Sequence, residues 1–239
     1  ARPPPDVGTL YNDAGTMPAL KWDESGKRYG ETGTKQGVIY RKDASGKYKN
    51  AAAWDGLTGV STEPEGGEAN DNYADDQKYL TLMSAENFKG TIKAFQFPPE
   101  FAECDGTALF DESLKGSFVT GQDRIPFGFS WVTTIVNDDK GTAFGYRVHL
   151  AYGCLASPSS QENATINDSP SLKEFSWSFS GTPVPVPGKK ASSYLYFDSR
   201  YENPKVLKKL LEILHGTDST PAELPLPAEL LPVLKAAAQ

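Results

Sequence analysis

Alternation of apolar and polar residues predicts that most of this chain forms β-strands. Phe175, Trp177 and Phe179 alternate with polar side chains, which is the pattern of a half-buried strand. Residues 126–136 and 142–155 are rich in aromatic and β-branched residues, and the polar stretch 137–141 between them is typical of a hairpin loop. Further strands are expected at 19–22, 37–41, 47–54, 78–83, 91–97 and 192–198. The sequence therefore predicts a mainly β fold.

Helical spacing of apolar residues appears near the C-terminus. Asn203 is placed to cap a helix, Pro204 suits its first position, and Gly216 suits its end. A second amphipathic segment follows at 228–235, and residues 98–106 fit a helix of one or two turns. We therefore expect a short helix flanking the β core and C-terminal helices packed on the same domain.

Three regions follow from these patterns. Residues 1–18 contain three successive prolines and are expected to form an extended N-terminal arm, because proline excludes helix and favours extended backbone. Residues 19–200 are expected to form the β domain, with the acidic segment as a long loop. Residues 201–239 are expected to form the helical extension.

An acidic segment interrupts the strand pattern between Trp54 and Tyr79. No basic residue occurs between Lys49 and Lys78. The segment predicts a strand, a long acidic loop over 61–77, and a second strand. Loops of this length in compact domains are functional or disordered, although a run of charge is more often a solvated surface. The candidate functional residues are Glu63, Glu65, Glu68, Asp71, Tyr73, Asp75, Asp76 and Tyr79.

The composition of the chain argues against some classes of binding partner and cellular setting. The formal net charge of −7 argues against a protein that grips nucleic acid, because such affinity comes from neutralising phosphates with Lys and Arg. The two cysteines, Cys104 and Cys154, are expected to be reduced and buried, with a single disulfide as the lesser alternative. No apolar run approaches the length of a membrane-spanning helix.

No catalytic, cofactor-binding or metal-binding site is predicted. The only histidines, His149 and His215, lack metal-ligand spacing and are expected to be structural. The acidic segment lacks the residue order of an EF-hand. Its carboxylates cluster in one segment rather than on facing strands, which disfavours a glycosidase. The four tryptophans could form a sugar-binding platform, but such residues are more often core in a β-sandwich.

Several short phrases occur in an order that is not generic. The phrases are WDGLTGV (54–60), EPEGGE (63–68), NYADDQKY (72–79), GTIKAF (90–95), PPEFAECDG (98–106), GQDR (121–124), FGFSW (127–131), NDDKG (137–141), HLAYG (149–153), TINDS (165–169), FSW (175–177) and PVPV (183–186). Together they resemble the major tail protein of long, flexible-tailed bacteriophages, the subunit of the tail tube, over residues 19–231.

The resemblance implies a β-sandwich or barrel core with a short flanking helix. It also implies a structural virion protein rather than an enzyme. Subunits of that family form hexameric rings, and the rings stack into a tube through which the genome passes into the host. The implied partners are other copies of the chain, a tape measure protein and tail-end proteins, with DNA passing the lumen without specific binding. The implied location is the virion tail, after synthesis in the host cytoplasm.

Two hypotheses assign parts of the chain within such a tube. The acidic loop either lines the lumen or bridges stacked rings, and its length and the tyrosines Tyr73 and Tyr79 favour the bridge. The N-terminal arm and the 228–235 helix, with Leu230, Leu231 and Leu234, are candidates for contact with a neighbouring subunit. The alternative function is a carbohydrate-binding or host-attachment β-sandwich of a phage, and a glycosidase is the weakest.

Overall fold

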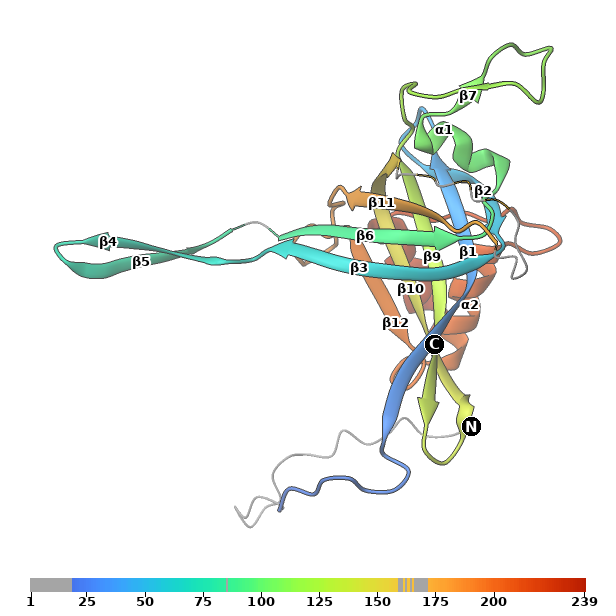
Figure 1. Ribbon diagram of the computed structural model, residues 1–239. Coiled ribbons are helices and arrows are strands. Elements are labelled where there is room, and N and C mark those ends of the chain that lie inside the picture. The colour runs from blue at the N-terminus through green and yellow to red at the C-terminus, as the bar shows by residue number, and fades with distance from the viewer. Residues whose placement is uncertain (1–18, 85, 159–160, 162, 164, 166–171) are drawn as a thin grey trace.

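The computed structural model describes residues 19–84, 86–158, 161, 163, 165 and 172–239. Strands dominate this part of the chain, and all of the paired strands run antiparallel (Figure 1). The mainly β fold is therefore confirmed. The N-terminal arm expected at 1–18 lies outside the described residues. In the part that the structure describes, no helix is long and apolar enough to cross a membrane.

An eight-stranded sheet forms the body of the protein. Its strands follow the order β2-β1-β9-β10-β11-β6-β3, and β12 pairs with β10 beside this path. The bounds are β1 (Tyr29–Lys42), β2 (Tyr48–Trp54), β3 (Leu57–Gly66), β6 (Glu86–Ala94), β9 (Phe127–Asn137), β10 (Gly141–Pro158), β11 (Phe175–Gly181) and β12 (Tyr194–Asp198). The predicted hairpins around 43–46 and 137–141 are both present, as the pairings β1–β2 and β9–β10.

The sheet curls until its last strand returns towards its second. Leu57 of β3 lies so close to Gly37 of β1 that a Cβ on Gly37 would come within 2.3 Å of Leu57 Cδ1. The interior of this open barrel is filled by an aromatic core that includes Trp54, Phe129, Trp131 and Trp177. The alternation predicted for β11 is confirmed, since Trp177 and Phe179 are buried while Ser178 is exposed.

A short helical segment closes one end of the barrel. It consists of η1 (Pro99–Phe101) and α1 (Ala102–Asp105), and Gly106 ends it with a φ of 83°, a left-handed conformation that glycine adopts at no steric cost. Phe101 and Cys104 are fully buried and belong to the aromatic core. The short flanking helix expected at 98–106 is therefore confirmed. It is followed by the small hairpin of β7 (Ala108–Leu109) and β8 (Phe118–Val119).

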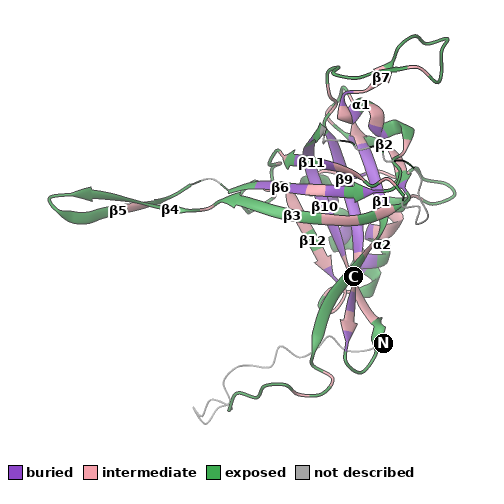
Figure 2. Cartoon of the chain, in the orientation of Figure 1, coloured by how far each residue is buried: buried purple, intermediate pink, exposed green. Residues whose placement is uncertain are grey.

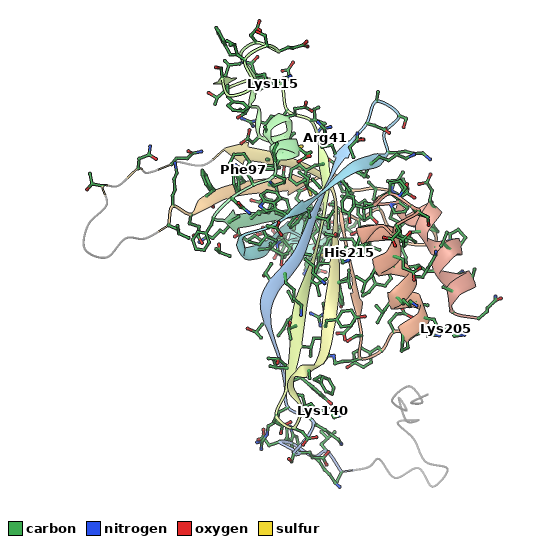
Figure 3. All side chains as sticks on the ribbon, turned by 90° about the vertical axis from the view of Figure 1, so that its right-hand side faces the viewer. Arg41, Phe97, Lys115, Lys140, Lys205 and His215 are labelled. Carbon is green, nitrogen blue, oxygen red and sulfur yellow. The ribbon has the colours of Figure 1, made fainter. Side chains whose placement is uncertain are left out.

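The C-terminal helices cover the outer face of the sheet. Figure 3 shows α2 (Pro204–His215) and α3 (Pro227–Ala237) together on one side of it. A second core lies between the helices and β1, β9 and β10. Tyr40 reaches through this core and donates a hydrogen bond of 2.7 Å to the carbonyl of Leu214, which ties the end of α2 to the sheet. Pro204 occupies the first turn of α2 as predicted, and Gly216 follows its last residue.

Asn203 caps α2, and its removal should destabilise the fold modestly. Its side chain accepts a 3.0 Å hydrogen bond from the backbone amide of Lys205. We expect Asn203→Ala to lower the free energy of unfolding by about 1 kcal/mol, measured by urea denaturation with tryptophan fluorescence. Asn203→Ser should lose little, because serine also caps. An unchanged midpoint in the alanine variant would contradict this role.

Two segments differ from the expected strands. Residues 19–22 form no strand, and Trp22 is 77% exposed, so the expectation of a first strand there is wrong. The first strand is instead β1, which begins at Tyr29, before the predicted residue 37. The hydrophobic pattern placed this start too late, because residues 29–36 show no alternation of apolar and polar side chains. Their extended conformation accompanies pairing with β9.

Candidate functional site

The acidic segment is a projecting β-hairpin and not a loop. β4 (Ala69–Ala74) pairs with β5 (Gln77–Met83), and the ribbon continues the β3–β6 pairing away from the barrel. Asp75 and Asp76 make its turn with φ values of 51° and 58°, the left-handed pair that a tight two-residue hairpin turn requires. The expected loop over 61–77 is therefore wrong. We call residues 67–85 the arm.

Several acids of the segment are already paired along the ribbon. Glu65 forms an ion pair with Lys89 across the β3–β6 ladder. Asp71 forms an ion pair with Lys78 at 2.7 Å and accepts a 2.7 Å hydrogen bond from Thr81. The bond from Lys78, and to a smaller extent the bond from Thr81, lowers the pKa of the Asp71 carboxyl. Among the described residues, Glu68, Asp75 and Asp76 take part in no ion pair. The remaining negative charge of the arm is concentrated in these three.

The arm also exposes large apolar side chains. Almost all of its described residues are exposed, as the green ribbon in Figure 2 shows. Tyr79 is 79% exposed and Tyr73 70%. Leu80, Leu82 and Met83 are exposed beside them. A two-stranded ribbon has no core of its own and is marginally stable in water. A ribbon of this composition is typical of an element that another surface covers.

A second feature is an extension of the sheet with two unpaired edges. It consists of residues 29–36 of β1, the adjoining halves of β9 and β10, and β12, and we call it the four-strand extension. Among the described residues, β2 pairs with β1 only from Gly37 onward, so residues 29–36 lack a partner on that side. Within the same described part of the chain, β12 pairs only with β10. Unpaired edges of this kind favour pairing with another chain.

The face of this extension opposite the helices carries a charge-paired network. Arg147 forms an ion pair with Glu31 and a second, at 2.9 Å, with Asp198. Arg200 donates to both oxygens of Asp198, at 2.9 and 2.7 Å. Burial opposes ionisation of Asp198, but the bonds from Arg200 and Arg147 outweigh it and lower its pKa to about 2. The charges of the two arginines and the two carboxylates therefore cancel on this face.

His149 lies at the inner edge of this network as a structural residue. Its ring stacks on Trp131 with centroids 4.8 Å apart. Its Nδ1 lies 2.6 Å from the Tyr194 hydroxyl and its Nε2 lies 2.8 Å from Thr133 Oγ1. Thr133 also donates to Glu31 at 2.5 Å, so the neutral tautomer with hydrogen on Nε2 satisfies every partner. Burial is the main reason that the pKa of His149 falls to about 4, with Glu31 opposing the shift.

This histidine should make the fold less stable in mild acid. Its pKa is about 4 in the folded chain and about 6.5 when unfolded, so the unfolded state binds the proton first as the pH falls. The free energy of unfolding should then drop by up to about 3 kcal/mol between pH 6.5 and 4. Asp198 adds a loss only at lower pH, below about 4.

The comparison of His149→Gln with the natural chain isolates the effect. Urea denaturation at a series of pH values from 7 to 4 gives the free energy of unfolding as a function of pH. The slope of this dependence should correspond to about one proton fewer in the variant than in the natural chain. Burial also lowers the pKa of His215. Because His215 is present in both proteins, its contribution cancels in the comparison. Equal slopes in the two proteins would assign the acid sensitivity to other groups.

The leucines expected to meet a neighbour are mostly used within the chain. Leu230 and Leu234 are 3% and 7% exposed and belong to the core beneath the helices, so they are not available for contact with another copy. Both side chains share that core with residues of β2 and α2, which explains their burial. Leu231, at 37% exposed, is the one of the three that remains at the surface.

Both cysteines and three of the four tryptophans are buried within the fold. Cys104 and Cys154 are unpaired and buried, as expected, and burial raises the pKa of Cys104 to about 12. Trp54, Trp131 and Trp177 are core residues, which removes three of the four tryptophans from any sugar-binding platform. No group of three or more potential metal ligands occurs among the described residues.

Sequence reasoning selected the arm residues as candidates, and it did not identify the charge network. Glu31, Arg147, Asp198 and Arg200 come from three separate strands and the turn after β12. The one available signal was Arg147, a charged residue inside the strongest strand pattern of the chain. The structure brings these four together, whereas it places the arm away from them.

No family model and no curated protein matches this sequence. Two of the solved structures that align with this chain cover most of it. One is a chain of the sheath–tube complex of the PVC extracellular contractile injection system in its extended state, with 10% identity, a TM-score of 0.34, and coverage of 68% of this chain and 88% of that chain. The other is a chain of the 6-fold symmetrised anti-feeding prophage baseplate, with 10% identity, a TM-score of 0.32, and coverage of 76% and 97%.

Proposed function

We propose that this chain is a structural subunit that joins copies of itself into hexameric rings, which stack into a phage tail tube for DNA delivery. The observation that carries the proposal is the four-strand extension. It has one face covered by helices, one polar face, and an unpaired edge on each side. An isolated sheet with such edges invites aggregation, whereas closure into a ring removes them.

The strand directions suit closure by repetition of the same chain. Within the extension β1, β9, β10 and β12 alternate in direction, so β12 runs antiparallel to β1. The β1 strand of a neighbouring copy can therefore follow β12 and continue the alternation. A head-to-tail contact of this kind closes when its rotation allows. In a hexamer it would give roughly 24 strands, more than the roughly 16–18 that already enclose an aqueous channel in porins.

The polar face suits a lumen that does not retain DNA. Its two arginines, Arg147 and Arg200, are engaged by Glu31 and Asp198. A phosphate group would have to displace these carboxylates, and binding of DNA depends on cations that neutralise phosphates. We infer that this face, and not the acidic arm, lines the tube. The arm then serves contacts between copies, together with exposed residues such as Leu231.

The remaining parts of the proposal follow from the resemblance. The tape measure protein and tail-end proteins would meet the lumen and the two ends of the tube. The protein would act in the virion tail and have no catalytic role. The carbohydrate-binding alternative is not proposed, because three of its four candidate tryptophans are core residues.

The test is assembly of the purified protein without any ligand. Negative-stain electron microscopy should show rings or tubes, and light scattering after gel filtration should show masses that are multiples of 25.9 kDa. Labelled duplex DNA at physiological salt should not be retained by the assemblies. A protein that stays monomeric at every concentration, or that binds DNA tightly, would overturn the proposal.

A further inference from the structure

A groove lies between β2 and the two C-terminal helices. It has a volume of about 470 Å³ and is lined by residues of β2, of the link 223–226, of α2 and of α3. Its apolar lining includes Ile213, Leu226 and Val233, and Val233 is 40% exposed. The groove therefore combines a partly apolar surface with open access, and no described segment fills it.

The lining of this groove carries one more positive than negative charge. Lys47, Lys49 and Lys209 line it together with Glu223 and Glu229. Lys47 pairs with Glu229 at 3.2 Å, and Lys209 lies 3.7 Å from Glu212. Among the described residues Lys49 takes part in no ion pair. A negatively charged partner with apolar side chains suits such a lining.

The arm has this complementary chemistry. Residues 68–84 contain four acids, Glu68, Asp71, Asp75 and Asp76, and one lysine, Lys78. Because Asp71 and Lys78 pair with each other, the other three carboxylates are left to meet external cations. The exposed rings of Tyr73 and Tyr79 on the same ribbon are the type of side chain that anchors protein interfaces.

The arm and the groove lie on opposite sides of the molecule. In Figure 1 the arm leaves the barrel on the left, while β2 and α2 lie on the right. The arm also runs across the direction of β9 and β10. It therefore points sideways, towards the next copy in a ring, and not along the strands. Complementary surfaces on opposite sides of one chain make a head-to-tail contact that a ring can close.

We propose that the arm of each subunit docks in the lysine-lined groove of its neighbour within the same ring. This inference rests on the proposed assembly and adds the acceptor surface and the direction of the contact. The carboxylates of Glu68, Asp75 and Asp76 face the groove lysines, and the arm's tyrosines cover its apolar lining. The contact orders the ribbon, which has no core of its own.

Reciprocal charge changes test this pairing. The groove variant is K47E/K49E/K209E, and the arm variant is E68K/D75N/D76G, which keeps an Asn-Gly turn suited to the left-handed pair of residues. Each variant should raise the protein concentration needed for assembly at least about tenfold, since like charges then meet or attraction is lost. The two sets combined should restore assembly to within about threefold of the natural chain.

The matched control is K205E/K208E/K235E. These lysines lie on the same helices, are exposed, and do not line the groove, so the same change of charge should leave assembly within about twofold of the natural chain. Circular dichroism melting of each variant checks that it folds. A groove variant that assembles like the natural chain, or a combined variant without recovery, would overturn the docking.

Cross-linking provides an independent readout on the unaltered protein. A carbodiimide joins a carboxylate directly to a lysine it contacts, so assembled protein should yield peptides linking the arm acids to Lys47, Lys49 or Lys209 between copies. Arm acids linked only to other surfaces would overturn the docking. If the natural chain forms tubes and the groove variant forms them equally well, only the docking contact is refuted. If the natural chain never assembles, the proposed function itself is refuted.

Discussion

Replacement of the arm, residues 67–85, by Asn-Gly should give a folded monomer that no longer forms rings or tubes. Gly66 and Glu86 face each other in the β3–β6 ladder, so a two-residue turn can join them without altering the register. None of the described residues of the arm belongs to either core. The free energy of unfolding should therefore change by less than about 1 kcal/mol, while the concentration needed for assembly should rise beyond the measurable range.

Two measurements separate the expected outcome from a folding defect. Near-ultraviolet circular dichroism and urea denaturation should match those of the natural chain, and analytical ultracentrifugation should show a single monomeric species. Tyr73→Phe is a mild companion variant that keeps the ring and should still assemble. Tubes of normal appearance from the shortened chain would show that the arm is dispensable and that the four-strand extension alone holds the ring together.

The arm also shows why sequence patterns failed where they did. Acids and glycines between 63 and 76 resemble a loop, because β-strands are usually identified by one buried face. The strand expected at 78–83 is present as β5, but neither face of β4 is buried in its own chain, so no alternation marked that strand. The signal present was the turn, since consecutive aspartates tolerate the left-handed conformation seen at Asp75 and Asp76. A strand without a buried face in its own chain leaves no hydrophobic period to detect.

Local rules succeeded where a single element determines its own structure. Asn203 and Pro204 begin a helix and Gly216 follows its end, because capping and proline geometry act within one turn. The 137–141 hairpin was predictable for a similar reason, as adjacent strands pair through a short turn. The Glu31–Arg147 pair was not predictable, because the two residues are 116 positions apart and meet only through the β1–β9–β10 register.

Phe101 lies in a local element that the sequence predicts, but its tertiary contacts could not be predicted. The proline-led helix at 98–106 was predictable, but its role as the plug of the barrel was not. Phe101 is fully buried, with ring centroids 4.6 Å from Trp54, 5.2 Å from Trp177 and 5.5 Å from Phe127. Three strands from distant parts of the chain therefore depend on one side chain.

Phe101→Ala should lower the free energy of unfolding by about 3–5 kcal/mol, because it removes a large buried ring and leaves a cavity among rigid neighbours. Phe110→Ala is the matched control. Phe110 follows on the β7–β8 hairpin and is 71% exposed, so its loss should change stability by less than about 0.5 kcal/mol. Urea denaturation of both variants measures the difference. Equal stabilities would mean that the helical plug is not part of the cooperative core, and that the barrel closes on β-strand packing alone.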